Sequence, residues 1–269
     1  ENLNFLYENG KKNGVLDLQI VEKNKIKDFV PHLNGKAAIF STSTGILDTH
    51  KFMQKLEFLI KQNGGSILYN NEVVKIEKIN NGYKLILKDV NNNINEIISE
   101  IVINSAGLSS DKIAQMVGIN DYKLYYCKGE YFKLGQKYKN LTEYLIYPVV
   151  NKNFHSLGIH TVLDLSGNIK IGPNSFYVET IDYSVNASHI DEFYFGIKKF
   201  FNFIQKEDLS ADTSGIRPKL QGPTDTFKDF VIKEEVYKGY KNFINLVGIE
   251  SPGFTSSLAI AKYVKKLLN

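Results

Sequence analysis

The chain has 269 residues, of which 43% are hydrophobic and 23% charged, and its formal net charge at pH 7 is +4; this length allows one large or two smaller domains with a buried core. Its lysines are spread among acidic residues without a dense basic block, which argues against nucleic-acid binding, and no apolar run approaches the roughly 20 residues of a membrane-spanning helix. The single cysteine, Cys127, excludes an internal disulfide and a cysteine-cluster metal site, and is compatible with a reducing, cytoplasmic compartment.

Short helices and strands alternate in the first part of the chain. The first predicted element is a short helix that includes residues 3–7 and ends by Gly10 or Gly14. A strand at 15–21, a helical turn at 26–30, a strand at 37–40 and a helix between Thr49 and Gly64 follow. Strands follow at 66–69, 73–79, 83–90 and 97–103. The last of these is almost continuously apolar, which predicts a strand buried on both faces.

The second half of the chain is richer in strands. The predicted elements are strands at 122–134, 145–150, 157–165 and 169–171, a helix at 189–205, strands at 229–232 and 243–247, and a closing helix at 255–268. Gly, Pro and Asn turns separate the strands between 122 and 180, which indicates an antiparallel sheet. The fold class predicted from this pattern is α+β.

Two Gly-containing turns offer backbone groups to a ligand. In the first, a buried strand ends in Ser105-Ala106-Gly107, whose small side chains let a bulky ligand approach the backbone. In the second, Gly248 to Gly253 leads into the last helix, whose first N–H groups could hold a developing negative charge. Each motif alone is also compatible with an ordinary connection between a strand and a helix.

Two side chains are candidates for chemistry. Arg217 is the only arginine among the 33 basic residues, and it stands between Gly215 and Pro218, where a guanidinium could clamp a carboxylate through two hydrogen bonds. His160 lies in an apolar strand, and a neutral imidazole facing a cavity could remove a hydroxyl proton. The alternatives are a surface ion pair for Arg217 and a structural core histidine for His160.

An ordered set of motifs, spread over nearly the whole chain, resembles the L-2-hydroxyglutarate oxidase/dehydrogenase family of D-amino-acid-oxidase-like flavoproteins. The matching blocks are Ser43-Thr44-Gly45-Ile46-Leu47-Asp48, Asn104-Ser105-Ala106-Gly107-Leu108, Lys128-Gly129-Glu130-Tyr131-Phe132, Tyr147-Pro148-Val149, Leu157-Gly158-Ile159-His160, Gly172-Pro173-Asn174, Gly215–Pro223 and Gly248–Ser257. The last two blocks together are the most specific.

The resemblance implies an FAD-binding α/β part interleaved with an antiparallel, β-rich substrate domain. It implies a substrate-domain segment at 1–44, a partial FAD-binding domain at 45–120, the substrate domain at 121–210, and a return to the FAD-binding domain at 211–269. The implied FAD contacts are Val73, Val74, Ser105, Ala106, Gly107, Gly253, Phe254, Thr255 and Ser256. Arg217 would hold the substrate carboxylate, His160 would act as base or hydroxyl partner, and Tyr131 would bind a second carboxylate or line the pocket.

The sequence departs from the family at two places. It has no G-x-G-x-x-G turn, which the family carries near its N-terminus and on which the FAD pyrophosphate sits. We therefore expect that roughly the first hundred residues of such a protein are not in this chain. The family also has arginine where this chain has Lys128, which argues against a second guanidinium in the pocket.

The function implied by the resemblance is oxidation of L-2-hydroxyglutarate to 2-oxoglutarate by hydride transfer to flavin. One alternative is a related flavin oxidase acting on an amino acid or on glycerol 3-phosphate. Another is an inactive fragment that binds FAD poorly because it lacks the phosphate-binding turn. The expected partner is a small 2-hydroxy acid, without nucleic acid, metal or an integral membrane segment. The electron acceptor stays open, and a quinone acceptor would imply peripheral membrane attachment.

Overall fold

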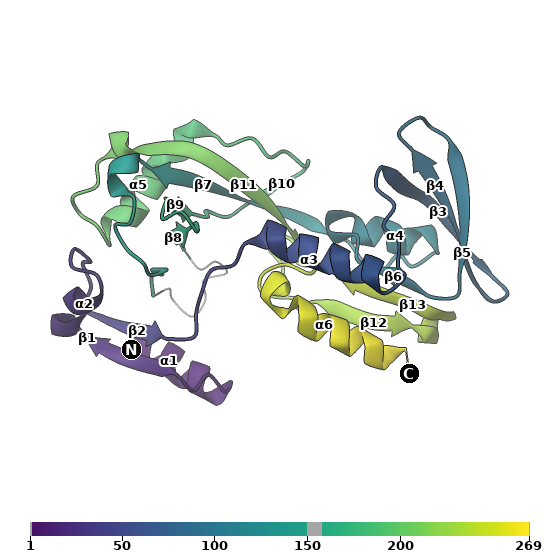
Figure 1. Ribbon diagram of the computed structural model, residues 1–269, viewed down its shortest axis with the longest axis horizontal. Coiled ribbons are helices and arrows are strands. Elements are labelled where there is room, and N and C mark those ends of the chain that lie inside the picture. The colour runs from purple at the N-terminus through teal and green to yellow at the C-terminus, as the bar shows by residue number, and fades with distance from the viewer. Residues whose placement is uncertain (1, 150–157, 269) are drawn as a thin grey trace. The chain divides into compact units, whose positions relative to one another are not determined.

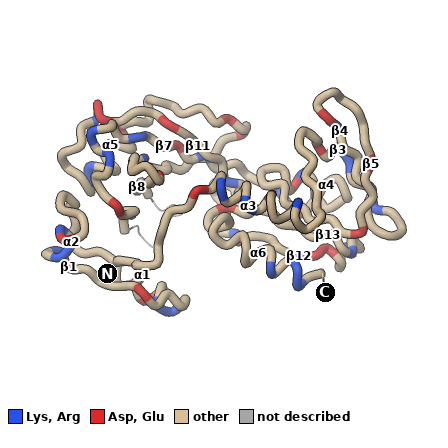
Figure 2. Tube along the Cα trace, in the orientation of Figure 1, with Lys and Arg blue, Asp and Glu red and all other residues tan. Residues whose placement is uncertain are grey.

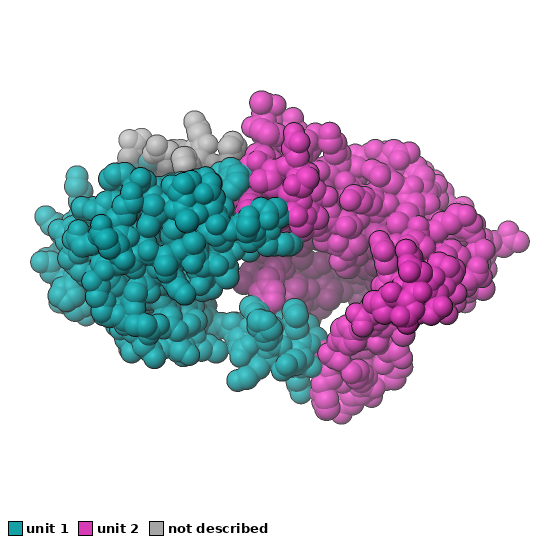
Figure 3. Space-filling model, turned by 90° about the horizontal axis from the view of Figure 1, so that it is seen from above, with its two compact units in different colours: residues 1–56, 129–176, 182–215 teal, residues 57–128, 177–181, 216–269 magenta. Residues whose placement is uncertain are grey.

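The computed structural model describes residues 2–149 and 158–268 (Figure 1). The chain divides into two compact units, coloured separately in Figure 3. Unit 1 holds residues 1–56, 129–176 and 182–215, and unit 2 holds residues 57–128, 177–181 and 216–269. Residues 45–56, which the sequence analysis assigned to the FAD-binding part, lie in unit 1 by this division.

Unit 1 contains a helical N-terminal part and most of an antiparallel-rich sheet. Its helices are α1 (Asn2–Lys12), α2 (Lys23–Phe29), the first half of α3 (Thr49–Gln62) and α5 (Ile190–Lys198). The hairpin-like pair β1 (Leu18–Glu22) and β2 (Ala37–Ser41) is antiparallel. A five-stranded sheet has the order β10-β7-β9-β8, with β11 also pairing with β7. Its strands are β7 (Tyr125–Leu134), β8 (His160–Leu163), β9 (Ile169–Gly172), β10 (Phe176–Val178) and β11 (Leu209–Lys219).

The core of unit 1 forms where α5 packs on β8 and β9. Phe193 and Ile197, four residues apart on one face of α5, are fully buried. The Phe193 ring lies 4.5 Å from that of Phe132 on β7, and Ile171 of β9 is also fully buried. Burying an aromatic or aliphatic side chain of this size contributes about 1.5–3 kcal/mol. This packing holds β8 and β9, and therefore His160, in place.

Unit 2 contains two three-stranded sheets, the second half of α3 and two further helices. The antiparallel sheet has the order β3 (Asn71–Ile79), β4 (Gly82–Asp89), β5 (Ile94–Ser99). The second sheet joins β12 (Val231–Glu235), β13 (Tyr240–Val247) and β6 (Val102–Asn104), and the β13–β6 pair is parallel. The two further helices are α4 (Ser110–Met116) and α6 (Gly253–Leu267). Across both units, the described residues also form the 3-10 turns η1 (Gly107–Ser109), η2 (Gln136–Tyr138), η3 (Ala187–His189), η4 (Lys206–Asp208) and η5 (Val236–Lys238).

The core of unit 2 joins both of its sheets to α4. The buried Tyr83 ring of β4 lies 5.3 Å from that of Phe243 on β13, and its hydroxyl donates to the Lys241 carbonyl oxygen at 2.8 Å. Ala114 of α4 is fully buried in the same cluster. The phenol therefore ties the antiparallel sheet to the strand that precedes α6, with its polar end satisfied.

Four of the predicted elements are wrong. The apolar run 97–103 is not one buried strand: it splits at Glu100 into β5 and β6, which belong to different sheets, and Ile98 is 70% exposed. Residues 66–69 are irregular, and Leu68 and Tyr69 are exposed without a ladder partner in the described chain. An apolar run forms a strand only where a partner strand accepts it, which composition does not reveal.

The other two errors lie in the substrate-side segment. Residues 145–149 are irregular, since only Ile146 bonds to a neighbouring strand, through Thr161, and Val150 and Leu157 lie outside the described residues. The predicted helix 189–205 ends at Lys198, and a turn then keeps Phe201 and Ile204 fully buried. Helical periodicity cannot distinguish a longer helix from a turn that buries the same side chains. Strands β10 and β11 were not predicted.

Charged residues are dispersed over the described chain. Figure 2 shows Lys and Arg interspersed with Asp and Glu along the trace. Several form exposed pairs, such as Lys228 with Asp225 at 3.2 Å. Exposed pairs of this kind contribute little to stability.

Candidate functional site

His160 begins β8 in unit 1 and is 6% exposed. Its Nδ1 lies 2.8 Å from the Gly158 carbonyl oxygen. Because a carbonyl oxygen can only accept, Nδ1 carries the hydrogen, and the neutral ring presents Nε2 as an acceptor. Burial lowers the pKa of His160 below its ordinary value of 6.5, and the bond to Gly158 opposes this only in part. The imidazole is therefore neutral near pH 7 and has the form of a general base.

Tyr147 stacks on this imidazole. The two ring centroids are 4.2 Å apart with an interplanar angle of 21°. Burial raises the pKa of the Tyr147 hydroxyl, so the phenol stays protonated at neutral pH. The stack fixes the plane of the His160 ring and hence the direction of Nε2. Tyr147 was not predicted as a site residue, although its Tyr-Pro-Val block was one of the family-like motifs.

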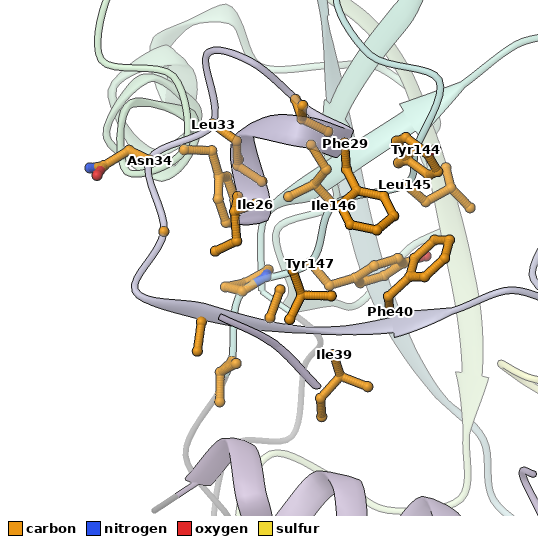
Figure 4. A pocket seen from close by; sticks show the side chains of 18 of the residues that line it. Ile26, Phe29, Leu33, Asn34, Ile39, Phe40, Tyr144, Leu145, Ile146 and Tyr147 are labelled. Atoms are coloured by element: carbon orange, nitrogen blue, oxygen red, sulfur yellow. The ribbon is translucent and has the colours of Figure 1, made fainter. Parts of the chain in front are cut away.

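An apolar cavity of about 270 Å³ lies beside Tyr147 within unit 1 (Figure 4). Phe29 of α2 and Phe40 of β2 line it and contact each other, with ring centroids 4.9 Å apart (Figure 4). Tyr144 and Ile146 complete this part of the wall. None of the described lining residues is charged. The cavity therefore offers no cation to a carboxylate, and a carboxylate of a bound acid has to be held elsewhere.

Arg217 lies in β11 at the edge of unit 2 and is half-buried. Burial raises the pKa of Tyr177, nearby negative groups raise it further, and the positive charge of Arg217 opposes the rise. The Tyr177 hydroxyl therefore stays protonated at neutral pH. That hydroxyl donates to the Gln221 carbonyl oxygen at 3.0 Å, so it ties the chain just after Arg217 to β10.

The loop after β6 exposes Ser105, Ala106 and Gly107. Gly107 has φ +54°, and a Cβ added there would meet nothing within 4 Å. The preceding Asn104 is buried and donates to the Ser110 carbonyl oxygen at 2.7 Å and to Asn245 Oδ1 at 2.8 Å. The loop is therefore anchored at its base and open at its tip.

The N-terminus of α6 provides the second set of predicted cofactor contacts. Gly253 is buried, Phe254 is 43% exposed, and the Thr255 and Ser256 hydroxyls both donate to the Pro252 carbonyl oxygen. The N-cap residue of α6 is Pro252, and among the described residues no side chain forms a capping hydrogen bond there. The Gly253 N–H, the first of this 15-residue helix, bonds to the Glu250 carbonyl oxygen at 2.5 Å, and the aligned peptide dipoles give this end of the helix a positive partial charge.

These two turns meet at a groove within unit 2. The groove has a volume of about 560 Å³ and runs along α6. Ser105, Gly107, Gly253 and Ser257 line it near the start of the helix, apolar residues of β6, β13 and α6 line the rest, and Lys265 adds one positive charge near the end of the helix. Small and apolar groups beside a helix N-terminus suit a flat, partly polar ring. The structure thus brings together three of the predicted cofactor residues, and shows Ser257 as a further lining residue.

The other predicted residues lie elsewhere. Val73 packs against the core of unit 2, and Val74, 37% exposed, sits at a bulge where β3 and β4 change register. Neither lines the groove. Tyr131 lies on β7 in unit 1, and its ring edge would be 3.0 Å from a Cβ placed on Gly172. The described residues contain no cluster of His, Cys, Asp or Glu that could hold a metal ion.

The family model for FAD dependent oxidoreductases (DAO) matches residues 1–267. The chain belongs to this family. It is 31% identical over 302 aligned positions to the mitochondrial L-2-hydroxyglutarate dehydrogenase of Arabidopsis thaliana, covering 97% of this chain and 62% of that protein. It is 32% identical over 271 positions to the glycerol 3-phosphate dehydrogenase of Caloramator mitchellensis, covering 99% of this chain and 53% of that protein. The chain therefore spans less than two thirds of the length of these two relatives.

Solved structures of flavoenzymes share the fold. The FAD-bound L-alpha-glycerophosphate oxidase of Mycoplasma pneumoniae superposes with a TM-score of 0.84 at 21% identity, covering 100% of this chain and 69% of that one. The glycine oxidase of Geobacillus kaustophilus gives a TM-score of 0.76 at 18% identity, covering 99% and 66%. The family assignment and the D-amino-acid-oxidase-like α+β fold predicted from the sequence are confirmed. No described helix has the length and apolar character needed to cross a membrane.

The turn that leads into α6 depends on Gly248. This residue has φ +72°, and a Cβ there would lie 2.6 Å from Leu220 Cγ. We expect Gly248→Ala to lower the free energy of unfolding by about 1–3 kcal/mol, because alanine meets both backbone strain and a clash. Urea unfolding followed by circular dichroism measures the change. Gly215→Ala is the matched control, since a Cβ at Gly215 meets nothing within 4 Å; equal effects of the two substitutions would contradict the prediction.

Proposed function

We propose that the chain takes part in the FAD-dependent oxidation of an L-2-hydroxy acid, namely L-2-hydroxyglutarate to 2-oxoglutarate. In this proposal it supplies the residues that bind the substrate and those that contact the flavin ring. The observation that carries this proposal is the neutral His160, with Nδ1 bonded to Gly158 and its ring stacked on Tyr147. An alcohol has to lose its hydroxyl proton as its Cα–H is oxidised, and a base that is neutral at pH 7 suits this task. Similarity to L-2-hydroxyglutarate dehydrogenases supports the choice of substrate.

The residues of unit 2 fit a flavin ring. Ser105 and Gly107 have no side-chain bulk to block a ring, and Gly253 opens α6 beside them in the same groove. When bound, the flavin supplies the acceptor for a hydride. The backbone N–H groups at the start of α6 would stabilise negative charge on the reduced ring. Val73 and Val74 remain proposed contacts of the adenine side.

Substrate recognition is assigned to Arg217, His160 and Tyr131. Arg217 would hold the Cα carboxylate through two parallel hydrogen bonds, and His160 Nε2 would accept the hydroxyl proton. Tyr131 would contact the second carboxylate or form the pocket wall. The uncharged cavity beside Tyr147 is unsuited to either carboxylate.

A second candidate function is oxidation of glycerol 3-phosphate. Similarity to the glycerol 3-phosphate dehydrogenase of Caloramator mitchellensis over 99% of this chain favours it. That substrate also loses a hydroxyl proton, so His160 would serve it equally, while Arg217 would hold a phosphate. An amino-acid substrate is a weaker alternative, because an amine has no hydroxyl proton to remove.

The test is anaerobic mixing of the FAD-loaded protein with each substrate while the flavin absorbance is followed. Bleaching by L-2-hydroxyglutarate, and not by its D-enantiomer, is the expected result. Bleaching by glycerol 3-phosphate alone would favour the second candidate, and no bleaching by either would overturn the proposed function. Because the sequence has no G-x-G-x-x-G turn, we expect loading to require added FAD. Stoichiometric flavin after purification without added FAD would contradict that expectation.

A further inference from the structure

A buried ion pair joins the end of β11 to the turn before α6, inside unit 2. Lys219 Nζ lies 2.7 Å from Glu250 Oε1, and the two side chains are only 8% and 11% exposed. They are 31 residues apart in sequence. The Lys84–Glu77 pair of the same unit is less buried, with side chains 31% and 35% exposed.

Both partners occupy positions that matter for the proposed site. Lys219 follows Arg217 by two residues on the same strand, so their side chains leave the strand on the same side. Glu250 precedes Gly253, the first residue of α6, and its own carbonyl oxygen accepts a hydrogen bond from the Gly253 N–H at 2.5 Å. Glu250 thus fixes the turn through both its side chain and its main chain.

Stability alone does not explain such a pair. Two charges removed from water lose solvation that their attraction only offsets, and apolar replacements of both partners are often equally stable. A buried ion pair does, however, select one geometry, because any displacement leaves a charge without its partner. A positional role is therefore the better explanation of its burial.

We infer that Lys219 and Glu250 are positioning residues, which set the distance between Arg217 and the N-terminus of α6. This inference rests on the proposed function, in which Arg217 holds the substrate carboxylate and the start of α6 contacts the flavin ring. The pair fixes the Gly248–Gly253 turn against the end of β11. The Tyr177 hydroxyl, bonded to the Gln221 carbonyl oxygen, holds the same stretch of chain from β10. Neither Lys219 nor Glu250 contacts substrate in this role.

The experiment compares the wild-type chain with the double variant Lys219→Met/Glu250→Leu. Hydrogen exchange followed by mass spectrometry is measured first, because it needs neither FAD nor substrate. Exchange of the amides between 249 and 256 is expected to rise at least about tenfold, while the amides of β3 and β4 keep their protection. The double variant Lys84→Met/Glu77→Leu, at a half-buried pair distant in sequence from the turn, is the matched control and is expected to leave the turn unchanged.

The FAD-loaded protein provides the second measurement. The Lys219→Met/Glu250→Leu variant is expected to raise the KM for L-2-hydroxyglutarate and lower kcat/KM by about 100-fold, as for a misplaced binding group. The conservative variant Lys219→Arg, which keeps the charge, is expected to recover most of this loss. Unchanged exchange at 249–256 in the folded double variant, or an equal rise throughout unit 2, would overturn the inference.

The two measurements also separate this inference from the proposed function. If the wild-type protein oxidises none of the tested substrates, the proposed function fails, and hydrogen exchange alone decides on the positional role. If the double variant does not fold, the single variant Glu250→Gln is compared with Lys219→Arg. Faster exchange at 249–256 in Glu250→Gln and normal exchange in Lys219→Arg support the role; equal exchange in both contradicts it.

Discussion

Replacing Arg217 with lysine is expected to raise the KM for L-2-hydroxyglutarate by about 100-fold, equivalent to about 2–3 kcal/mol of binding free energy. A guanidinium binds a carboxylate through two parallel N–H donors, whereas an ammonium offers a single point charge on a flexible stem. Lysine keeps the net charge, so the change isolates the geometry of the contact. Steady-state kinetics of the FAD-loaded variant measure the effect.

The control is Lys228→Ala, which removes an exposed cation of the same unit whose side chain is 52% exposed. It is expected to leave kcat and KM unchanged, since exposed pairs contribute little. Circular dichroism confirms that both variants fold. Full activity in Arg217→Lys would remove Arg217 from the carboxylate role. Among 33 Lys and Arg residues this is the only arginine, so no other guanidinium of the chain can replace it.

Local patterns predicted most of the regular elements. The apolar face of α3, the β3–β4 hairpin with its Asn-Asn-Gly turn and the closing helix α6 all appear within a few residues of their predicted bounds. In these segments the periodicity or the turn residues decide the structure without help from distant residues. The short helix α5 buries Phe193 and Ile197 although it ends at Lys198, earlier than predicted.

The failures occurred where distant partners decide. The run 97–103 is almost continuously apolar, yet the chain breaks at Glu100 and Ile101 into strands of two different sheets. Strand β11 was not predicted, because its Ser, Asp, Thr and Gly residues interrupt the alternation of apolar and polar residues that is typical of a strand. Its pairing with β7 stabilises the strand in spite of this composition. Strand pairing depends on residues far apart in the sequence, so it cannot be predicted from local patterns in a single sequence.

The candidate site shows the same division. Residue chemistry pointed to His160 and Arg217, and the chain order of motifs pointed to Ser105, Gly107 and Gly253, which line one groove. Tyr147 and the Lys219–Glu250 pair escaped prediction, because a ring stack and a buried ion pair depend on tertiary contacts. The family blocks did contain Tyr147 and Glu250, but they gave no reason to connect either residue with its partner.

Replacing His160 with glutamine is expected to lower kcat for L-2-hydroxyglutarate by about 10²–10⁴-fold, the usual contribution of a general base. Glutamine can still bond to Gly158 and fill the space beside Tyr147, so the variant loses the proton acceptor and keeps the packing. Rapid mixing of the FAD-loaded variant with substrate measures the rate of flavin bleaching. His32→Gln, at an exposed histidine of the same unit, is the control and is expected to keep the wild-type rate.

The pH dependence of kcat/KM tests the role of His160 as the base. Burial lowers the pKa of His160 from 6.5, so the folded protein holds the neutral imidazole throughout the neutral range. Wild-type kcat/KM is therefore expected to stay level near pH 7 and to fall only as the pH drops through the lowered pKa; in His160→Gln this acid limb should vanish. Stability is also expected to decrease as the pH is lowered. Below pH 6.5 the unfolded chain binds the proton before the folded chain does, so the free energy of unfolding decreases more steeply on acidification in the wild type than in His160→Gln. An acid limb that survives in His160→Gln would assign the proton transfer to another group.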